Sequence, residues 1–232
     1  MPYSKSDSRK TFDDRLRNLK KTCRIADVKK SNTPSDVKDL VMHAAIFETS
    51  AALEEYVKSF IEDYEYRLIN CNVAIKKLSQ NTRSFLLLNS TSQAVGMYVY
   101  EKNEKGAINK IDVEGECFDA IHGDMPYKAS VNLKRLVYGK KYPTVENWRS
   151  LFYRFGLDGF ESKVDPIIKG SSKNIMQSFN DVRTAIAHET PPSLTMLDTR
   201  DHIESVEKLI RGVDRVLYSH VCKHTGAMTW PG

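Results

Sequence analysis

The hydrophobic positions along this chain recur mostly at steps of three and four residues, which is the period of an amphipathic helix. Such stripes predict helices over residues 11–25, 33–68, 131–138, 145–155, 175–188 and 201–222. The second of these would be about 50 Å long, because each helical residue rises about 1.5 Å. A helix of that length can be the spine of a domain. We therefore expect a mainly α, up-and-down helical bundle.

Local signals fix several of the expected helix ends. Thr33 supplies an N-cap hydroxyl for the long helix, with Pro34 at its first position and Asp36 in its first turn. Gly156 predicts the end of the helix before it, because glycine adopts the left-handed conformation that follows many helices. The prolines at 191 and 192 predict that the preceding helix stops soon after His188.

Residues 69–130 carry no sustained helical period, and we expect them to form a polar insertion in one domain that spans residues 1–232. Within it we predict short helices over 72–77 and 83–88. A valine- and tyrosine-rich run over 94–100, followed by residues 108–113, predicts a small β-hairpin within about residues 90–125. The charged residues 1–10 are expected to form a flexible N-terminal segment.

Composition narrows the class of protein. The chain has 232 residues, of which 41% are hydrophobic and 28% charged, with a net charge of +5. No window approaches 18 apolar residues and no apolar signal core opens the chain, so we expect a cytoplasmic protein without a membrane segment. Four scattered cysteines without a C-x-x-C pair indicate reduced thiols, with no metal and no cofactor. The positive charge permits a polyanionic partner.

The candidate chemistry lies at the end of the helix over 175–188. Arg183 and His188 are five residues apart there, which places them about 140° apart around an ideal helix. They converge only if Arg183 uses its length, if the last turn distorts, or if a second copy of the helix supplies the partner. The same R-x4-H string occurs again at Arg215 and His220, so the string alone does not choose between them.

The order of several segments resembles the HEPN superfamily, in particular its RiboL-PSP-like branch of stand-alone nucleases. The resemblance covers about residues 35–220. It is carried by the segments Leu53–Lys58, Val131–Arg135, Leu151–Leu157 and Val182–His188, followed by a closing amphipathic helix. This collinear order favours Arg183 and His188 over the second string. It implies a HEPN-type helical bundle.

The resemblance also implies an activity, which is metal-independent cleavage of RNA by attack of the 2′-OH. Family members commonly act as toxins or anti-phage effectors, so an antitoxin or regulatory protein is an expected partner besides RNA. The family arrangement pairs two motif helices in a homodimer. The roles it implies are catalysis for Arg183, His188 and Glu54, and substrate binding for Thr184, Lys58 and Asp181.

Two positions depart from the family pattern, and structural alternatives exist for each assignment. Thr184 stands where the family usually has Asn, Asp or His, and Glu189 where it often has Gly. A non-catalytic HEPN dimer that binds RNA or protein is the alternative function. In that case the Arg–His pair only binds the free carbonyl groups at the C-terminal end of the helix and stabilises its dipole, and Glu54 forms an ion pair with Lys58 one turn away.

Further basic residues and the second string have simple structural readings. The basic cluster between residues 134 and 154 is expected to be a solvated face with a chance of contacting RNA. Its members are Lys134, Arg135, Lys140, Lys141, Arg149 and Arg154. We also expect the second string, Arg215 and His220, to lie on a solvated face.

Overall fold

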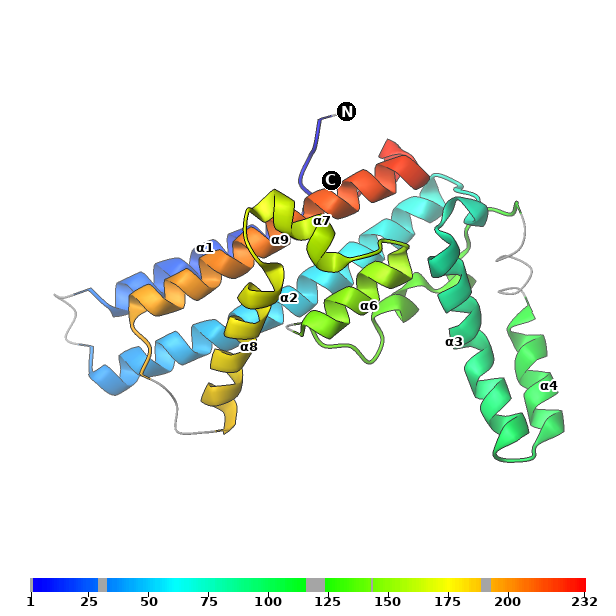
Figure 1. Cartoon of the computed structure of the whole chain (residues 1–232), viewed down its shortest axis with the longest axis horizontal. Helices are drawn as coiled ribbons and strands as arrows, with labels where there is room; N and C mark the ends of the chain where they lie inside the picture. The colour runs from blue at the N-terminus through cyan, green and yellow to red at the C-terminus, as the bar shows by residue number, and fades with distance from the viewer. Residues whose placement is uncertain (1, 29–32, 116–123, 143, 189–192) are drawn as a thin grey trace.

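The computed structural model describes residues 2–28, 33–115, 124–142, 144–188 and 193–232, and Figure 1 shows the whole chain. Within these ranges every regular element is a helix. The α-helices are α1 (Asp7–Ala26), α2 (Ser35–Asn70), α3 (Gln80–Val99), α4 (Glu104–Val113), α6 (Val145–Phe155), α7 (Phe160–Ile168), α8 (Ser172–His188) and α9 (Met196–His224). The predicted mainly α bundle is confirmed.

Helix α2 is the spine, and α1 and α9 run alongside it in Figure 1. Its buried face carries a row of large side chains one or two turns apart, which includes Leu53, Tyr56, Phe60 and Tyr64. The rings of Tyr56 and Phe60 stack at 6.4 Å between centroids. This apolar face holds the long helices together, because removing such side chains from water is the main favourable contribution to folding.

The N-terminus corrects our expectation of a flexible segment through residue 10. Helix α1 begins at Asp7, and the Ser6 hydroxyl caps it by accepting from the Arg9 amide at 3.0 Å. The fully buried carboxylate of Asp214 on α9 then accepts hydrogen bonds from Ser6 Oγ at 2.5 Å and from Tyr3 at 2.6 Å. The reason for the miss is that the partner lies about two hundred residues away, where local composition gives no sign of it.

The end of α6 and the start of α2 can be compared with the helix ends predicted from single residues. Gly156 ends α6 with φ of 82°, as predicted. The prediction for the start of α2 is wrong by one residue: Pro34 is the N-cap, and the helix begins at Ser35 without a side-chain cap. Proline fixes φ near the helical value and needs no capping hydroxyl to enter the helix.

The expected β-hairpin is wrong, because residues 80–99 form α3 and residues 104–113 form α4. The two helices pack on each other, and Figure 1 shows them projecting from the bundle as a hairpin arm. Strand propensity depends on context, and here packing of one helix on the other overrides the β-branched and aromatic content of 94–100. Of the two predicted short helices, 72–77 contains the 3₁₀ turn η1 (Ile75–Lys77), and 83–88 is part of α3.

The chain returns from this arm to the point where it left. An isolated antiparallel bridge joins Ala74 to Pro126, and the Tyr127 amide donates to the Val73 carbonyl at 2.7 Å. Next, the predicted helix over 131–138 proves to be two 3₁₀ turns, η2 (Ala129–Val131) and η3 (Leu133–Val137). Asn132 separates them with φ of 56°, which a continuous helix excludes.

Candidate functional site

Helix α8 carries the first R-x4-H string and packs unevenly along its length. Its fully buried side chains, Ser172, Met176 and Phe179, all lie in its N-terminal part. Beyond Phe179 no side chain of the helix is fully buried, and Val182 and Ile186 are only partly covered by the core. In Figure 1 this end of α8 extends past α2, away from the rest of the bundle. The string therefore lies on a helix end that the described residues leave largely uncovered.

Arg183 is half-buried, and its charge is not neutralised by the part of the chain that the structure describes. Its Nε is buried without a hydrogen-bond partner. Its guanidinium forms no ion pair or hydrogen bond with a described residue. The Nε of Arg9, which is buried in the bundle, is also unsatisfied, but the terminal nitrogens of Arg9 bind Asp13 at 2.6 Å and the Glu207 carbonyl at 2.9 Å. A half-buried cation with an unsatisfied donor is costly, and an anionic ligand would relieve that cost.

His188 is the last residue of α8 and is exposed. Its imidazole has no hydrogen bond to any described residue. The structure describes α8 as far as His188. The predicted helix end beyond it, with Glu189 and the prolines at 191 and 192, lies outside the described residues. As an exposed side chain it can be reached by solvent and by a ligand, as an acid–base group requires.

The other predicted site residues are divided between α8 and α2. Thr184 is exposed beside Arg183, and Asp181 accepts a hydrogen bond from Gln177 at 2.8 Å. Glu54 and Lys58 lie on α2 and form no ion pair with each other, so the simple pairing expected for them is not seen. They line a cavity between α2 and the segment 134–141, whose lining includes neither Arg183 nor His188. The structure does not bring Glu54 to the motif within this cavity.

The second string has a different environment on α9. Arg215 is exposed, as predicted, with its guanidinium 5.1 Å from the centre of the Tyr3 ring. The prediction that His220 lies on a solvated face is wrong: its side chain is buried between the rings of Phe155 and His224. Burial, and then the neighbouring His224 and Lys223, lower the pKa of His220 to about 4. It follows Val213 by seven residues and Val216 by four, so it continues the apolar stripe.

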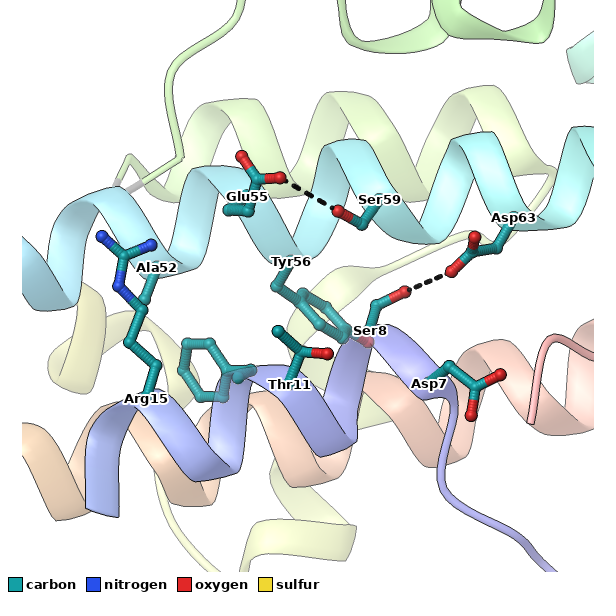
Figure 2. A pocket seen from close by; sticks show the side chains of 10 residues that line it. Asp7, Ser8, Thr11, Arg15, Ala52, Glu55, Tyr56, Ser59 and Asp63 are labelled. Carbon is teal, nitrogen blue, oxygen red and sulfur yellow. Dashed lines mark hydrogen bonds between the residues drawn. The ribbon is translucent and has the colours of Figure 1, made fainter. Parts of the chain in front are cut away.

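A cavity that sequence reasoning missed lies between α1 and α2 (Figure 2). Its volume is about 230 Å³, and its lining includes the carboxylates of Asp7, Glu55 and Asp63. Ser8 donates to Asp63 at 3.2 Å, and burial raises the pKa of the Asp63 carboxyl. Arg15 at its edge is already paired with Glu48 at 2.5 Å. A cavity with this many acids repels a polyanion, so it is not a site for RNA.

Other kinds of site find little support among the described residues. Within those ranges no three His, Cys, Asp or Glu side chains are grouped as metal ligands would be. The same ranges contain no helix that combines the length and apolar character needed to cross a membrane. Cys23, Cys71 and Cys222 are free thiols, and Cys117 lies outside the described residues.

Comparison with known proteins gives one match. The family model described as RiboL-PSP-HEPN matches residues 10–219, which is most of the chain. No curated protein and no solved structure matches. The match spans the segments that carry the resemblance seen in the sequence.

Proposed function

The chain belongs to the RiboL-PSP-HEPN family, and on that premise we propose that it is a metal-independent endoribonuclease. The observation that carries the proposal is the end of α8. There an exposed histidine and a half-buried arginine without a described partner lie five residues apart on a helix end that the described residues leave largely uncovered. Histidine can serve as the acid or base of RNA cleavage without a metal, and arginine can stabilise the charge that develops on the phosphate.

The proposed reaction uses His188 as the general base. Its imidazole takes the proton of a ribose 2′-OH, and the 2′-oxygen attacks the adjacent phosphorus. The bond to the 5′-oxygen breaks, and that oxygen takes up a proton. Arg183 donates hydrogen bonds to the phosphate oxygens as negative charge develops on them, for which its planar fork is suited. The products are a 2′,3′-cyclic phosphate and a 5′-hydroxyl.

The proposed active unit is a symmetric homodimer. Because Arg183 and His188 are about 140° apart around the helix, one chain offers a sparse site. Two α8 ends related by a two-fold axis would bring two arginines and two histidines into one cleft, and they would cover Val182 and Ile186. The His188 side chain of the second copy then protonates the 5′-oxygen. In this arrangement Thr184 lies beside the substrate and Asp181 has a supporting role. Glu54 acts instead from the separate cavity that it lines.

The experiment that tests the proposal is an RNA cleavage assay with purified protein, with and without EDTA. We expect cleavage in both conditions and fragments that end in 2′,3′-cyclic phosphate. A requirement for magnesium, or fragments with 3′-hydroxyl ends, would contradict the mechanism. Dimerisation is checked by light scattering on the same protein, and a strictly monomeric active enzyme would remove the dimer from the proposal.

The biological setting we propose is a toxin or an anti-phage effector held inactive by an antitoxin or regulatory protein. Expression of the wild-type chain should arrest cell growth, and expression of the His188→Ala chain should not. The non-catalytic alternative, a dimeric RNA- or protein-binding module, gains support from the absence of Arg183 and His188 from the lining of the Glu54 cavity. Dimers that bind RNA without cutting it would establish that alternative.

A further inference from the structure

The basic cluster predicted between residues 134 and 154 is split into an occupied part, in which the side chains have partners, and a free part. Four of its six members are occupied: Lys134 with Glu62 at 3.1 Å, Arg135 with Glu114 at 3.3 Å, Arg149 with Glu161, and Arg154 with the Leu136 carbonyl. Lys140 and Lys141 form no ion pair or side-chain hydrogen bond with any residue in the described ranges. These two lysines therefore keep their charge available to a ligand.

Lys140 and Lys141 reach the same cavity as Lys58 of α2. The cavity has a volume of about 630 Å³ and lies between α2 and the segment 134–141. Lys58 is likewise unpaired among the described residues, so three free ammonium groups from two elements surround one hollow. The buried side chains of Ile61 and Val137 contribute an apolar wall. Such a combination of charged groups and apolar surface suits an amphiphilic anion.

The segment that carries the two lysines is held in place at both ends. The buried Glu65 of α2 accepts a hydrogen bond from the Leu133 amide at 2.7 Å. At the other end, the Lys141 carbonyl accepts from Asn147 at 2.6 Å. Between them Gly139 has φ of 69°, a conformation that L side chains rarely adopt. Because this backbone is already ordered, less conformational entropy is lost when a ligand binds.

An aromatic ring completes the site. Tyr138 lines the cavity and is 58% exposed, so its ring is available for stacking beside the lysines. Bases of single-stranded nucleic acids stack on exposed aromatic rings while lysines follow the phosphates. In a duplex the bases are already stacked on each other, so no base face is accessible for stacking on the tyrosine ring.

We propose that this cavity binds single-stranded RNA. Lys58, Lys140 and Lys141 contact successive phosphates, and Tyr138 stacks on one base. Glu54, which also lines the cavity, accepts a hydrogen bond from a ribose hydroxyl or a base amino group. This inference rests on the proposed function, since it places the part of the substrate strand that lies away from the cleaved bond.

The experiment measures binding separately from cleavage. The full-length His188→Ala chain is titrated with a fluorescein-labelled 12-nucleotide oligouridylate between 50 and 200 mM salt. The added Lys140→Ala/Lys141→Ala change should weaken binding at least threefold and lower the log–log salt slope by about 1.4, or about 0.7 for each phosphate that is no longer bound by a lysine. Tyr138→Ala should weaken binding about fivefold or more, and Tyr138→Phe should keep it, because stacking needs only the ring.

Matched controls test whether position matters beyond total charge. Lys105→Ala/Lys169→Ala removes the same charge from exposed lysines elsewhere, and Tyr100→Ala removes a tyrosine that is 85% exposed. Both should bind within about twofold of the parent. A duplex of the same length, or a polyglutamate of equal charge, should bind at least tenfold more weakly. Equal binding of either competitor would overturn the inference.

The outcomes separate this inference from the proposed function. If RNA binds the parent and the cavity variants equally well, the cavity inference is wrong while cleavage by Arg183 and His188 is unaffected. If the wild-type chain never cuts RNA but the cavity variants lose binding, the catalytic proposal fails and the RNA site stands. A parent chain that binds no RNA at 50 mM salt would overturn the cavity inference outright.

Discussion

The ends of α8 and α9 carry the same R-x4-H string in opposite environments. On α8 the arginine is half-buried without a described partner and the histidine is exposed. On α9 the arginine is exposed over a tyrosine ring and the histidine is buried among aromatic rings. An acid–base group must reach solvent and substrate, and an arginine that binds phosphate gains most where water is partly excluded. The comparison shows that the helix face each residue occupies, rather than the string, sets the environment of its side chain.

Among the variants that test this contrast, His188→Ala should show the largest loss of RNA cleavage. Loss of the general base should lower the cleavage rate by about 1,000-fold, within the range of 100- to 10,000-fold typical of acid–base groups. Because His188 is exposed at the end of α8, the variant should unfold at the same urea concentration as the parent. A cleavage rate within tenfold of the parent would remove this histidine from the mechanism.

Arg183→Ala should have the next largest effect, a loss of about 100-fold in kcat/KM, as expected for a group that stabilises charge in the transition state. The Arg183→Lys variant keeps the charge but loses the planar fork, so it should recover only part of that loss. Single-turnover cleavage of a defined RNA measures both. Full activity of the alanine variant would show that the unsatisfied guanidinium serves another purpose.

The buried His220 should affect how the stability of the protein depends on pH, whereas the exposed His188 should affect cleavage. The pKa of about 4 in the folded protein lies below the ordinary histidine value near 6.5, so the unfolded chain takes up the proton first as pH falls. Stability should therefore be lost between about pH 6.5 and pH 4, amounting to about 2–3 kcal/mol at pH 4.5. Urea unfolding of the parent and of His220→Gln at pH 7.5 and 4.5 isolates this contribution, because the variant lacks it.

Cleavage by the same His220→Gln variant should stay within about threefold of the parent at pH 7.5, a barrier change below about 0.7 kcal/mol. Its loss of packing should appear in the unfolding midpoint instead. If His220→Gln abolishes cleavage and His188→Ala spares it, the assignment of the motif to α8 is wrong.

Arg215→Ala should have the smallest effect. The contact with the Tyr3 ring is at the surface, where such contacts contribute about 0.5–1 kcal/mol. RNA cleavage should be within about twofold of the parent, and the urea midpoint should fall slightly. A loss of cleavage comparable to that of Arg183→Ala would mean that the two arginines act together.

What the sequence predicted well depended on local signals. The α6 boundaries follow from its apolar period and from Gly156, and the match over residues 10–219 confirms the family that the sequence resembles. The misses share a different cause, which is packing between elements that no local pattern reveals. Asp214 orders the N-terminus from α9, and the β-prone residues 94–99 are helical in α3, which packs on the following helix α4.

In the candidate site, too, the sequence predicted local features but not those that depend on tertiary structure. The sequence located Arg183 and His188 at a helix end, and it named Lys58, Lys140 and Lys141 without a reason to group them. Only the fold shows that these lysines surround one cavity while their neighbours are neutralised by Glu62, Glu114 and Glu161. Ion pairing between elements is set by tertiary structure, so charge patterns along the chain cannot reveal which cations stay free.

The hairpin arm of α3 and α4 has a consequence for local unfolding of the protein. Helix α4 packs mainly on α3, and the outer part of the arm leaves Val95, Ile108 and Ile111 exposed. Little buried surface opposes its opening, so the arm should open locally at a free-energy cost well below that of global unfolding. Amide protons of α4 should then exchange with deuterium much faster than those of α2, whose protection reports the whole bundle.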